Sequence, residues 1–162
     1  MRAVLSCLFF MLLAGFVRAD EPAKFMKFYS WWDGSWDVEL KKDGKAEELS
    51  MTITRPESDV HLVQGFGVGL WGYDPKREKW VGTGFADDGS FFTTVLKSHP
   101  GEVVTPGMKQ EATTTTKNAD GTITKGQETW TYVDENTATI VVKTTDEDGE
   151  VSSFKYTCKR RK

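Results

Sequence analysis

Trp31-Trp32-Asp33-Gly34-Ser35-Trp36-Asp37-Val38-Glu39-Leu40 is the stretch in which the hydrophobic period of this chain changes. Before it, Phe25, Phe28 and Trp32 recur at the spacing of one helix face, which predicts a short amphipathic helix over residues 21–32. From Ser35 onward, apolar and polar residues alternate, which is typical of a strand with one buried face. The stretch therefore joins a helical lead-in to the first of many strands.

The rest of the chain repeats this two-residue period between short turns. Asp43-Gly44 is a strong hairpin signal, and similar turns follow at regular spacing up to residues 146–149. We expect nine or ten strands, the later ones over residues 79–86, 90–97, 109–117, 122–133, 137–145 and 151–160. No helix long enough for a parallel crossover lies between them. The pattern predicts an all-β fold, an up-and-down antiparallel β-barrel with the short N-terminal helix plugging one end.

The first nineteen residues have the three-part pattern of a secretory signal peptide. Arg2 is followed by an apolar run over residues 4–16, and Val17-Arg18-Ala19 offers a cleavage position. We therefore expect residues 1–19 to be removed and residues 20–162 to form a single lipocalin-like domain. The predicted destination is the periplasm or the extracellular medium, and no later segment predicts a membrane anchor.

Charge and cysteine content narrow the function further. Removal of Arg2 and Arg18 changes the formal net charge from −3 to −5, with 19 basic against 24 acidic residues. An acidic balance argues against a nucleic-acid partner, which requires a basic face. Cys158 is then the only cysteine, so no internal disulfide can form, and its place in an apolar alternation predicts burial.

The opening Gly34-Ser35-Trp36, placed after a short helix, resembles the G-x-W motif of the lipocalin-like (calycin) barrels. That resemblance implies structural roles for Gly34 and Trp36, and an arginine of the last strand packed across the tryptophan. Phe154, Tyr156, Cys158 and Arg160 share one face of that strand, which points to Arg160, with Lys159 and Arg161 as the nearest alternatives. A guanidinium over an indole face would make a cation–π contact at one end of the barrel.

Residues 72–83, Gly-Tyr-Asp-Pro-Lys-Arg-Glu-Lys-Trp-Val-Gly-Thr, resemble a G-Y-D-P segment of a family of small exported bacterial proteins. That family is a domain of unknown function with a lipocalin-like barrel as its expected fold. The resemblance would span roughly residues 28–162 and implies a fold without an established activity. The chain departs from the family after Thr83, where Gly84-Phe85 replaces a tryptophan-containing continuation.

Two further features have both a functional and a structural interpretation. Residues 67–72 fit G-x-G-x-x-G, but no helix follows them, so we interpret them as glycines of a bent barrel strand rather than a dinucleotide site. His61 lies opposite in parity to Val60 and Leu62, which predicts an outward side chain. His99 lies in a Pro-Gly turn. Neither shows metal-ligand spacing, so no metal or haem cofactor is predicted.

Glu128 is the acid with the most unusual setting. It shares parity with Trp130 and Tyr132, so it points inward if those aromatics do. A carboxylate inside an apolar barrel would have a raised pKa and could bind or transfer a proton. The alternative, which we favour from the sequence, places Glu128 at the barrel mouth or pairs it with a basic group such as Arg160.

The chain has six tryptophans, ten phenylalanines and four tyrosines. If more of these side chains point inward than an eight-stranded interior can pack, the rest would line a cavity, and parity does not decide this. The leading hypothesis is a non-catalytic protein that binds a small hydrophobic or aromatic ligand in the barrel. The expected ligand-binding residues are Trp36, Trp80, Phe92, Glu128, Trp130, Tyr132 and Tyr156. Two alternatives remain: an interaction module with a filled barrel, and an enzyme that uses Glu128 with Tyr132 or Tyr156.

The threonine-rich residues 112–117 show no nucleophile spacing and predict a solvated strand face. The oligomeric state has no signal in the sequence.

Overall fold

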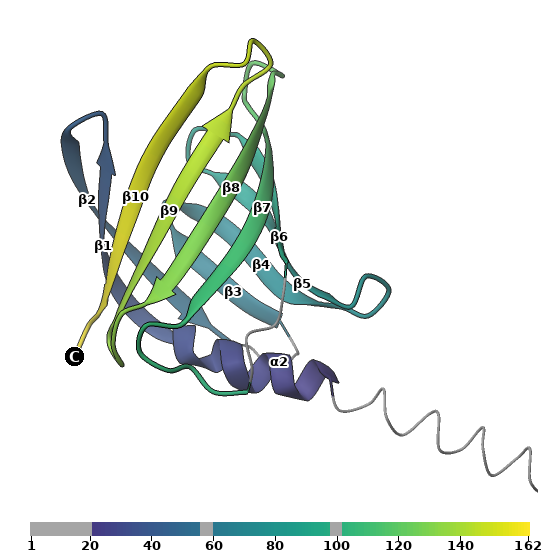
Figure 1. Cartoon of the computed structure of the whole chain (residues 1–162), viewed down its shortest axis with the longest axis vertical. Coiled ribbons are helices and arrows are strands. Elements are labelled where there is room, and N and C mark those ends of the chain that lie inside the picture. Colours follow the sequence, from purple (N-terminus) through teal and green to yellow (C-terminus); the bar gives the residue numbers. More distant parts are fainter. Residues whose placement is uncertain (1–20, 56–59, 98–101) are drawn as a thin grey trace, which may run out of the picture.

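The computed structural model describes residues 21–55, 60–97 and 102–162, and these form a closed antiparallel β-barrel with one α-helix (Figure 1). The strands follow one another around the barrel in chain order, and β1 closes it by pairing with both β2 and β10. They are β1 Gly34–Lys42, β2 Lys45–Thr54, β3 Val60–Gly65, β4 Gly67–Asp74, β5 Lys79–Ala86, β6 Phe91–Leu96, β7 Lys109–Lys117, β8 Ile123–Tyr132, β9 Thr137–Thr145 and β10 Val151–Arg160. The up-and-down barrel predicted from the sequence is confirmed. The signal-peptide prediction and His99 lie outside the described residues.

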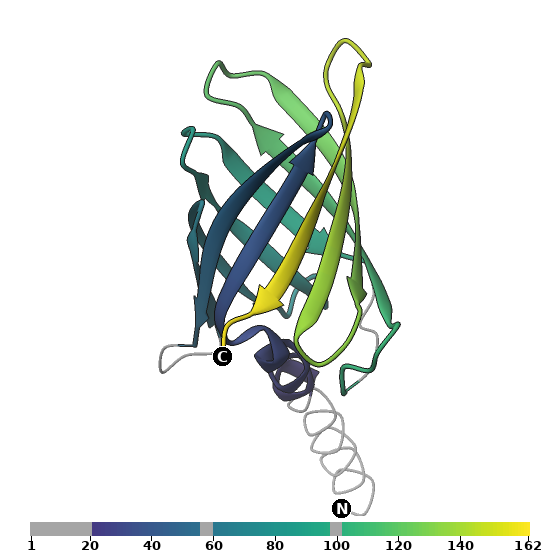
Figure 2. The same cartoon turned by 90° about the vertical axis from the view of Figure 1, so that its left-hand side faces the viewer.

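The helix lies across one end of the barrel, the same end at which the C-terminus lies (Figure 2). α2 spans Glu21–Tyr29 and continues as a short 3-10 helix, η1, over Ser30–Trp32, within the range predicted for a helix. Phe25, Phe28 and Tyr29 are buried against the barrel, and Tyr29 stacks on Trp80 with ring centroids 4.4 Å apart. We call this covered end the closed end. Within the described residues, no helix is both long enough and apolar enough to cross a membrane.

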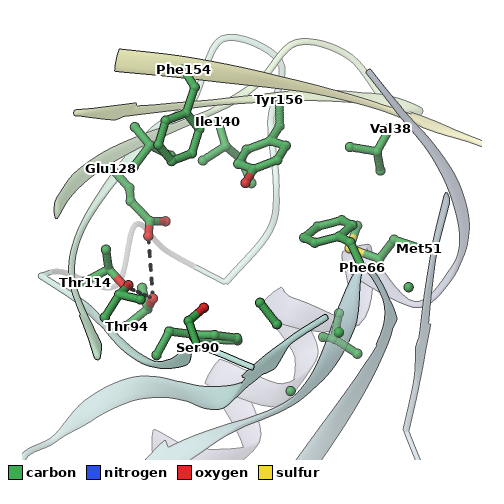
Figure 3. Close-up of a pocket in the computed structure, with 18 of the residues that line it drawn as sticks. Val38, Met51, Phe66, Ser90, Thr94, Thr114, Glu128, Ile140, Phe154 and Tyr156 are labelled. Atoms are coloured by element: carbon green, nitrogen blue, oxygen red, sulfur yellow. Dashed lines mark hydrogen bonds between the residues drawn. The ribbon is translucent and has the colours of Figure 1, made fainter. Parts of the chain in front are cut away.

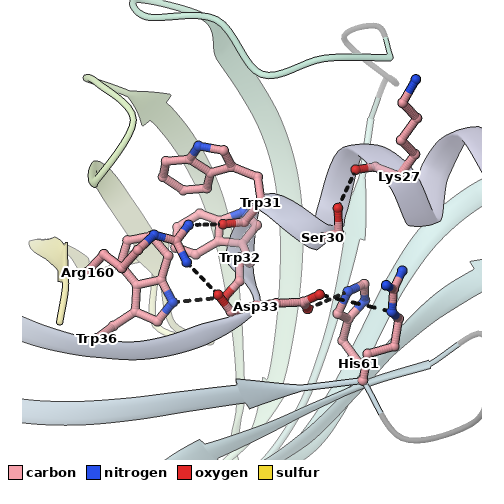
Figure 4. Close-up of polar contacts among 9 residues, drawn as sticks. Lys27, Ser30, Trp31, Trp32, Asp33, Trp36, His61 and Arg160 are labelled. Carbon is pink, nitrogen blue, oxygen red and sulfur yellow. Dashed lines mark hydrogen bonds and ion pairs between the residues drawn. The ribbon is translucent and has the colours of Figure 1, made fainter. Parts of the chain in front are cut away.

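A pair of contacts joins the first strand to the last at the closed end (Figure 4). The Arg160 guanidinium lies 4.3 Å from the Trp36 ring centroid and donates hydrogen bonds to the backbone carbonyls of Trp31 and Asp33. Gly34 has a φ of 118°, and a Cβ there would lie 3.3 Å from the guanidinium. The side chain of Arg161, by contrast, pairs with Asp37 on the outer surface. The geometry that the G-x-W resemblance implied is therefore present in this barrel.

Two glycines of β5 leave room for the backbone and a side chain of the neighbouring strand β4. A Cβ at Gly84 would lie 2.2 Å from the carbonyl oxygen of Val68, and one at Gly82 would lie 2.3 Å from the Trp71 ring. Only a residue without a side chain fits these two positions. The G-x-G-x-x-G run is part of this wall, because β4 contains it as a strand and no helix follows. The structural interpretation of the motif is confirmed.

The threonine-rich strand differs from the prediction. β7 has the predicted bounds, but only one of its faces is solvated. Gln110 and Ala112 are buried, and Thr114 and Thr116 point into the barrel. The prediction of a solvated face for residues 112–117 was wrong for the inner half, because every strand of a closed barrel has one face toward the interior.

Candidate functional site

The barrel interior contains a cavity of about 590 Å³. Its walls come from all ten strands, and its floor is formed by Tyr29 of α2 and Trp32 of η1. Lys42, Asp88, Asp146 and Glu150 line it near the hairpin turns at the far end, which we call the mouth. A volume of this size is typical of small-molecule sites in proteins, which range from roughly 300 to 1,000 Å³.

The cavity wall is mainly aromatic and aliphatic, with a polar sector of hydroxyl groups (Figure 3). The aromatic part comes from Phe66, Trp71, Trp80, Phe92, Trp130, Phe154 and Tyr156. The hydroxyl sector comes from Ser90, Thr94, Thr114, Thr116, Thr124, Thr144 and Ser152. Polar groups gathered on one side of a mainly apolar pocket can fix the orientation of a bound ligand.

Glu128 projects into this cavity from the middle of β8. Its Oε2 accepts a hydrogen bond from Trp130 Nε1 at 2.7 Å, and its Oε1 accepts a longer one from the Thr94 hydroxyl at 3.5 Å. Thr94 also lies 2.7 Å from the Thr114 hydroxyl. Burial raises the pKa of Glu128, and the two hydrogen bonds oppose that shift. The carboxyl group is therefore held by neutral donors alone.

The interpretation that we favoured for Glu128 from the sequence was wrong. Glu128 lies opposite Ala112 of β7 and Val142 of β9, in the middle of these strands, so it does not lie at the mouth. Arg160 is engaged with the backbone at the closed end and does not pair with it. The inward alternative is correct, because Glu128 does follow the parity of Trp130.

The other predicted ligand-binding residues divide into two groups. Trp80, Phe92, Trp130 and Tyr156 line the cavity together with Glu128. Trp36 and Tyr132 are fully buried in the packed layer against the helix. There the Tyr132 hydroxyl accepts a hydrogen bond from Trp32 Nε1 and donates one to Gln110, and burial raises the Tyr132 pKa.

Sequence reasoning missed several residues of the wall. Phe154 shares a face with Tyr156, so strand parity was a sufficient signal for it. Trp71 shares one face of β4 with Gly67 and Gly69, and it could have been found by assigning that face to the interior. Phe66 lies between two glycines at the β3–β4 turn, where no periodic signal exists, and its ring stacks on Tyr156 at 5.8 Å.

His61 corrects a second prediction, because it points into the barrel and is 2% exposed. Val60 and Leu62 face outward instead, next to the exposed Leu70 of β4. The predicted outward side chain of His61 rested on the assumption that the apolar face of β3 is the inner one. That assumption fails here, because this side of the barrel has an apolar outer face.

The imidazole of His61 lies near the junction of helix and barrel (Figure 4). Its Nε2 is 3.1 Å from Asp33 Oδ1, and its ring meets Trp80 edge-on at 5.5 Å. Neither ring nitrogen makes a well-aligned hydrogen bond within the described residues. Burial lowers the His61 pKa, while the Asp33 carboxylate acts in the opposite direction.

Among the described residues, no group of three or more His, Cys, Asp or Glu side chains is arranged to hold a metal ion. Cys158 is buried, as predicted, and burial raises the pKa of its thiol to about 12. Nucleophilic thiolate chemistry therefore has no support at this position.

No protein-family model matches this chain, and no curated protein matches it either. The G-Y-D-P resemblance therefore stays a prediction. Among solved structures, the chain is similar to EF1p2_mFAP2b bound to DFHBI, with 14% identity, a TM-score of 0.42, and coverage of 84% of this chain and 98% of that one. It is also similar to a redesigned β-barrel, mFAP1, bound to DFHBI, with 18% identity, a TM-score of 0.37, and coverage of 83% and 99%. Similarity at this level gives no information about what this barrel binds.

Proposed function

We propose that this protein binds a small, mainly apolar or aromatic molecule inside its barrel. The observation that carries the proposal is the cavity of about 590 Å³, whose wall combines large aromatic surfaces with one confined polar sector. Burial of apolar ligand surface contributes about 25 cal/mol per Å². Rigid strands supply the wall, so little ordering of the protein would oppose binding.

Neither alternative has comparable support. A filled barrel is at odds with the cavity. A proton-transfer enzyme needs a partner beside Glu128, but Tyr132 lies outside the cavity wall, packed against the helix. Burial, and after it the Glu128 charge, raises the pKa of Tyr156 to about 12, so its phenol remains protonated at neutral pH.

The test uses N-phenyl-1-naphthylamine, an uncharged probe whose fluorescence rises in apolar surroundings. We expect a saturable increase with one probe bound per protein. Thr144→Trp places an indole in the cavity, whereas Thr145→Trp, one residue further along β9, places it on the exposed outer face. The first variant should lose most of the signal and the second should keep it. Equal binding by two folded variants would contradict the proposal.

We also propose that the protein is exported after removal of residues 1–19, as the signal-peptide pattern predicts. The test is intact-mass analysis of the protein purified from its native host. A mature N-terminus at Asp20 is the expected result, and a retained N-terminus in the cytosolic fraction would refute export.

A further inference from the structure

We propose that the cavity is selective for a cationic ligand, a protonated amine on an aromatic or other apolar body, with the ammonium group against Glu128. This inference deepens the proposed function and rests on it. Three features support it: the unused acceptor capacity of the Glu128 carboxylate, the aromatic rings around it, and the charges at the mouth.

The carboxylate of Glu128 has acceptor capacity that the protein leaves unused. Each carboxylate oxygen can accept about two hydrogen bonds. The structure supplies one good bond to Oε2, from Trp130, and one long bond to Oε1, from Thr94. Figure 3 shows the carboxylate directed into the open part of the cavity. A donor that enters from the mouth therefore meets unoccupied lone pairs.

No cation of the described chain reaches this carboxylate. Lys42 is the only lysine or arginine among the described residues that line the cavity, and it lies at the mouth, at the end of β1. The groups that act on Glu128 are the Trp130 and Thr94 donors together with burial itself. An ionised carboxylate in such surroundings is costly unless a cation pairs with it. A ligand ammonium would supply that missing charge.

The surrounding rings suit the same chemistry. Tyr156 and Phe154 project into the cavity from β10, beside Glu128, and Trp130 adjoins it on β8 (Figure 3). A cation within about 6 Å of an aromatic centroid is attracted by the ring quadrupole. The same rings provide apolar contact for the body of the ligand. The site thus offers one anionic anchor within an aromatic enclosure.

The mouth carries mainly negative charge, which is complementary to a cationic ligand. Three carboxylates line it, Asp88, Asp146 and Glu150, against the single amine of Lys42. Asp88 accepts a hydrogen bond from the Ser90 backbone amide, and the interaction with Ser90 lowers its pKa, so Asp88 carries a charge at neutral pH. A concave opening lined by one sign of charge raises the local concentration of the opposite ion. Entry and anchoring therefore favour the same class of ligand.

The experiment displaces bound N-phenyl-1-naphthylamine with three compounds on one ring system: 1-naphthylmethylamine, 1-naphthylmethanol and 1-naphthoate. At pH 7 these present a cation, a neutral hydroxyl and an anion. We expect the amine to bind at least about tenfold more tightly than the alcohol, the range of a hydrogen bond to a charged group, and the naphthoate to bind most weakly.

Glu128→Gln keeps an acceptor for Trp130 but removes the charge. In this variant the amine should fall to the affinity of the alcohol, while the alcohol changes by less than about twofold. Glu48→Gln, which removes the same charge from an exposed position on β2, is the matched control and should leave the preference unchanged.

The outcomes separate the two proposals. Equal affinity of amine and alcohol in the wild type, with the probe still bound, overturns the cationic ligand and leaves the proposed function intact. Preference for the alcohol that disappears in Glu128→Gln also overturns it, because Glu128 would then act as a protonated donor. Failure of the probe to bind in the cavity overturns both proposals. The order of the three compounds in the wild type decides the question even if Glu128→Gln does not fold.

Discussion

The closed end and the mouth half of this barrel are built by the same ten strands, yet one is packed solid and the other is hollow. At the closed end, the inward positions carry large side chains such as Trp36 and Tyr132, and helix α2 adds Phe25 and Phe28. Toward the mouth, the inward positions carry small residues such as Gly67, Thr116 and Ser152. The alternation that specifies the barrel is identical in both halves.

The difference shows that the cavity is a matter of side-chain volume along each strand, not of topology. A barrel of more than eight strands has an interior that side chains fill only if many of them are large. In this protein the large inward residues are concentrated near the helix. The mouth half therefore keeps a space into which Glu128 and the hydroxyl sector project.

The largest expected effect is a difference in stability between a variant of the closed end and a variant of the cavity wall. Trp36 is fully buried, does not line the cavity and packs against Trp32 with ring centroids 5.2 Å apart. Trp36→Ala should lower the free energy of unfolding by about 3–5 kcal/mol, because it removes a fully packed indole. Phe154→Ala, in the cavity wall, should cost less than about half of that, since the ring already borders empty space. Denaturant titration measures both values.

Equal losses in the two variants would contradict the comparison. They would mean that the cavity wall is as tightly packed as the closed end. A larger loss for Phe154→Ala would also contradict it, because the side chains that contribute most to stability would then line the cavity.

A smaller effect concerns the contacts of Arg160 that stabilise the closed end. Arg160 lies over Trp36 and donates to two backbone carbonyls. Lysine keeps the charge but loses the planar, bidentate geometry, so Arg160→Lys should destabilise the fold by about 1–3 kcal/mol. Arg161→Lys is the control, because that side chain is exposed and pairs with Asp37; it should change stability by less than about 0.5 kcal/mol.

The midpoint of thermal unfolding is a convenient measure for these two variants. Similar midpoints for Arg160→Lys and Arg161→Lys would show that the contact across Trp36 contributes no more than a surface ion pair. The probe signal in both variants should match the wild type, because neither arginine lines the cavity.

Much of the fold was accessible from the sequence, because alternation and turn chemistry are local signals. The bounds of β7, β9 and β10 follow from them directly. The inner face of β3 was not accessible. Val60 and Leu62 make the outer face apolar, and the cavity accepts His61 on the inner one. Parity assigns residues to two faces of a strand but does not say which face is inside. The rule that the apolar face points inward fails where the interior is a partly polar cavity.

Glu128 illustrates the same limit at the site itself. Its parity with Trp130 was visible in the sequence, but the partners of an inward carboxylate depend on neighbouring strands. Thr94 is 34 residues away along the chain. Arg160 was a reasonable candidate partner until the structure placed it at the closed end. Register between strands is a tertiary property, so the local pattern could not decide between these two partners.

The smallest effect is a pH dependence that originates in the hollow half. Burial raises the Glu128 pKa above its ordinary value of 4.5, so the folded state binds the proton more tightly than the unfolded state. The stabilisation by protonated Glu128 is complete below about pH 4.5 and is lost as the pH rises through the raised pKa of the folded state. Glu128→Gln has no such loss. Its stability relative to the wild type should therefore increase between pH 4 and pH 8.

Denaturant titrations at a series of pH values measure this difference, with Glu48→Gln as the exposed control. The control should follow the wild type across the whole range, because its side chain is solvated in both states. A saturating cationic ligand should abolish the gain of Glu128→Gln, since the ammonium compensates the buried charge in the wild type alone. A difference that is constant with pH would show that the Glu128 carboxylate is as well solvated in the cavity as in the unfolded chain. The hollow half would then carry no electrostatic strain for a ligand to relieve.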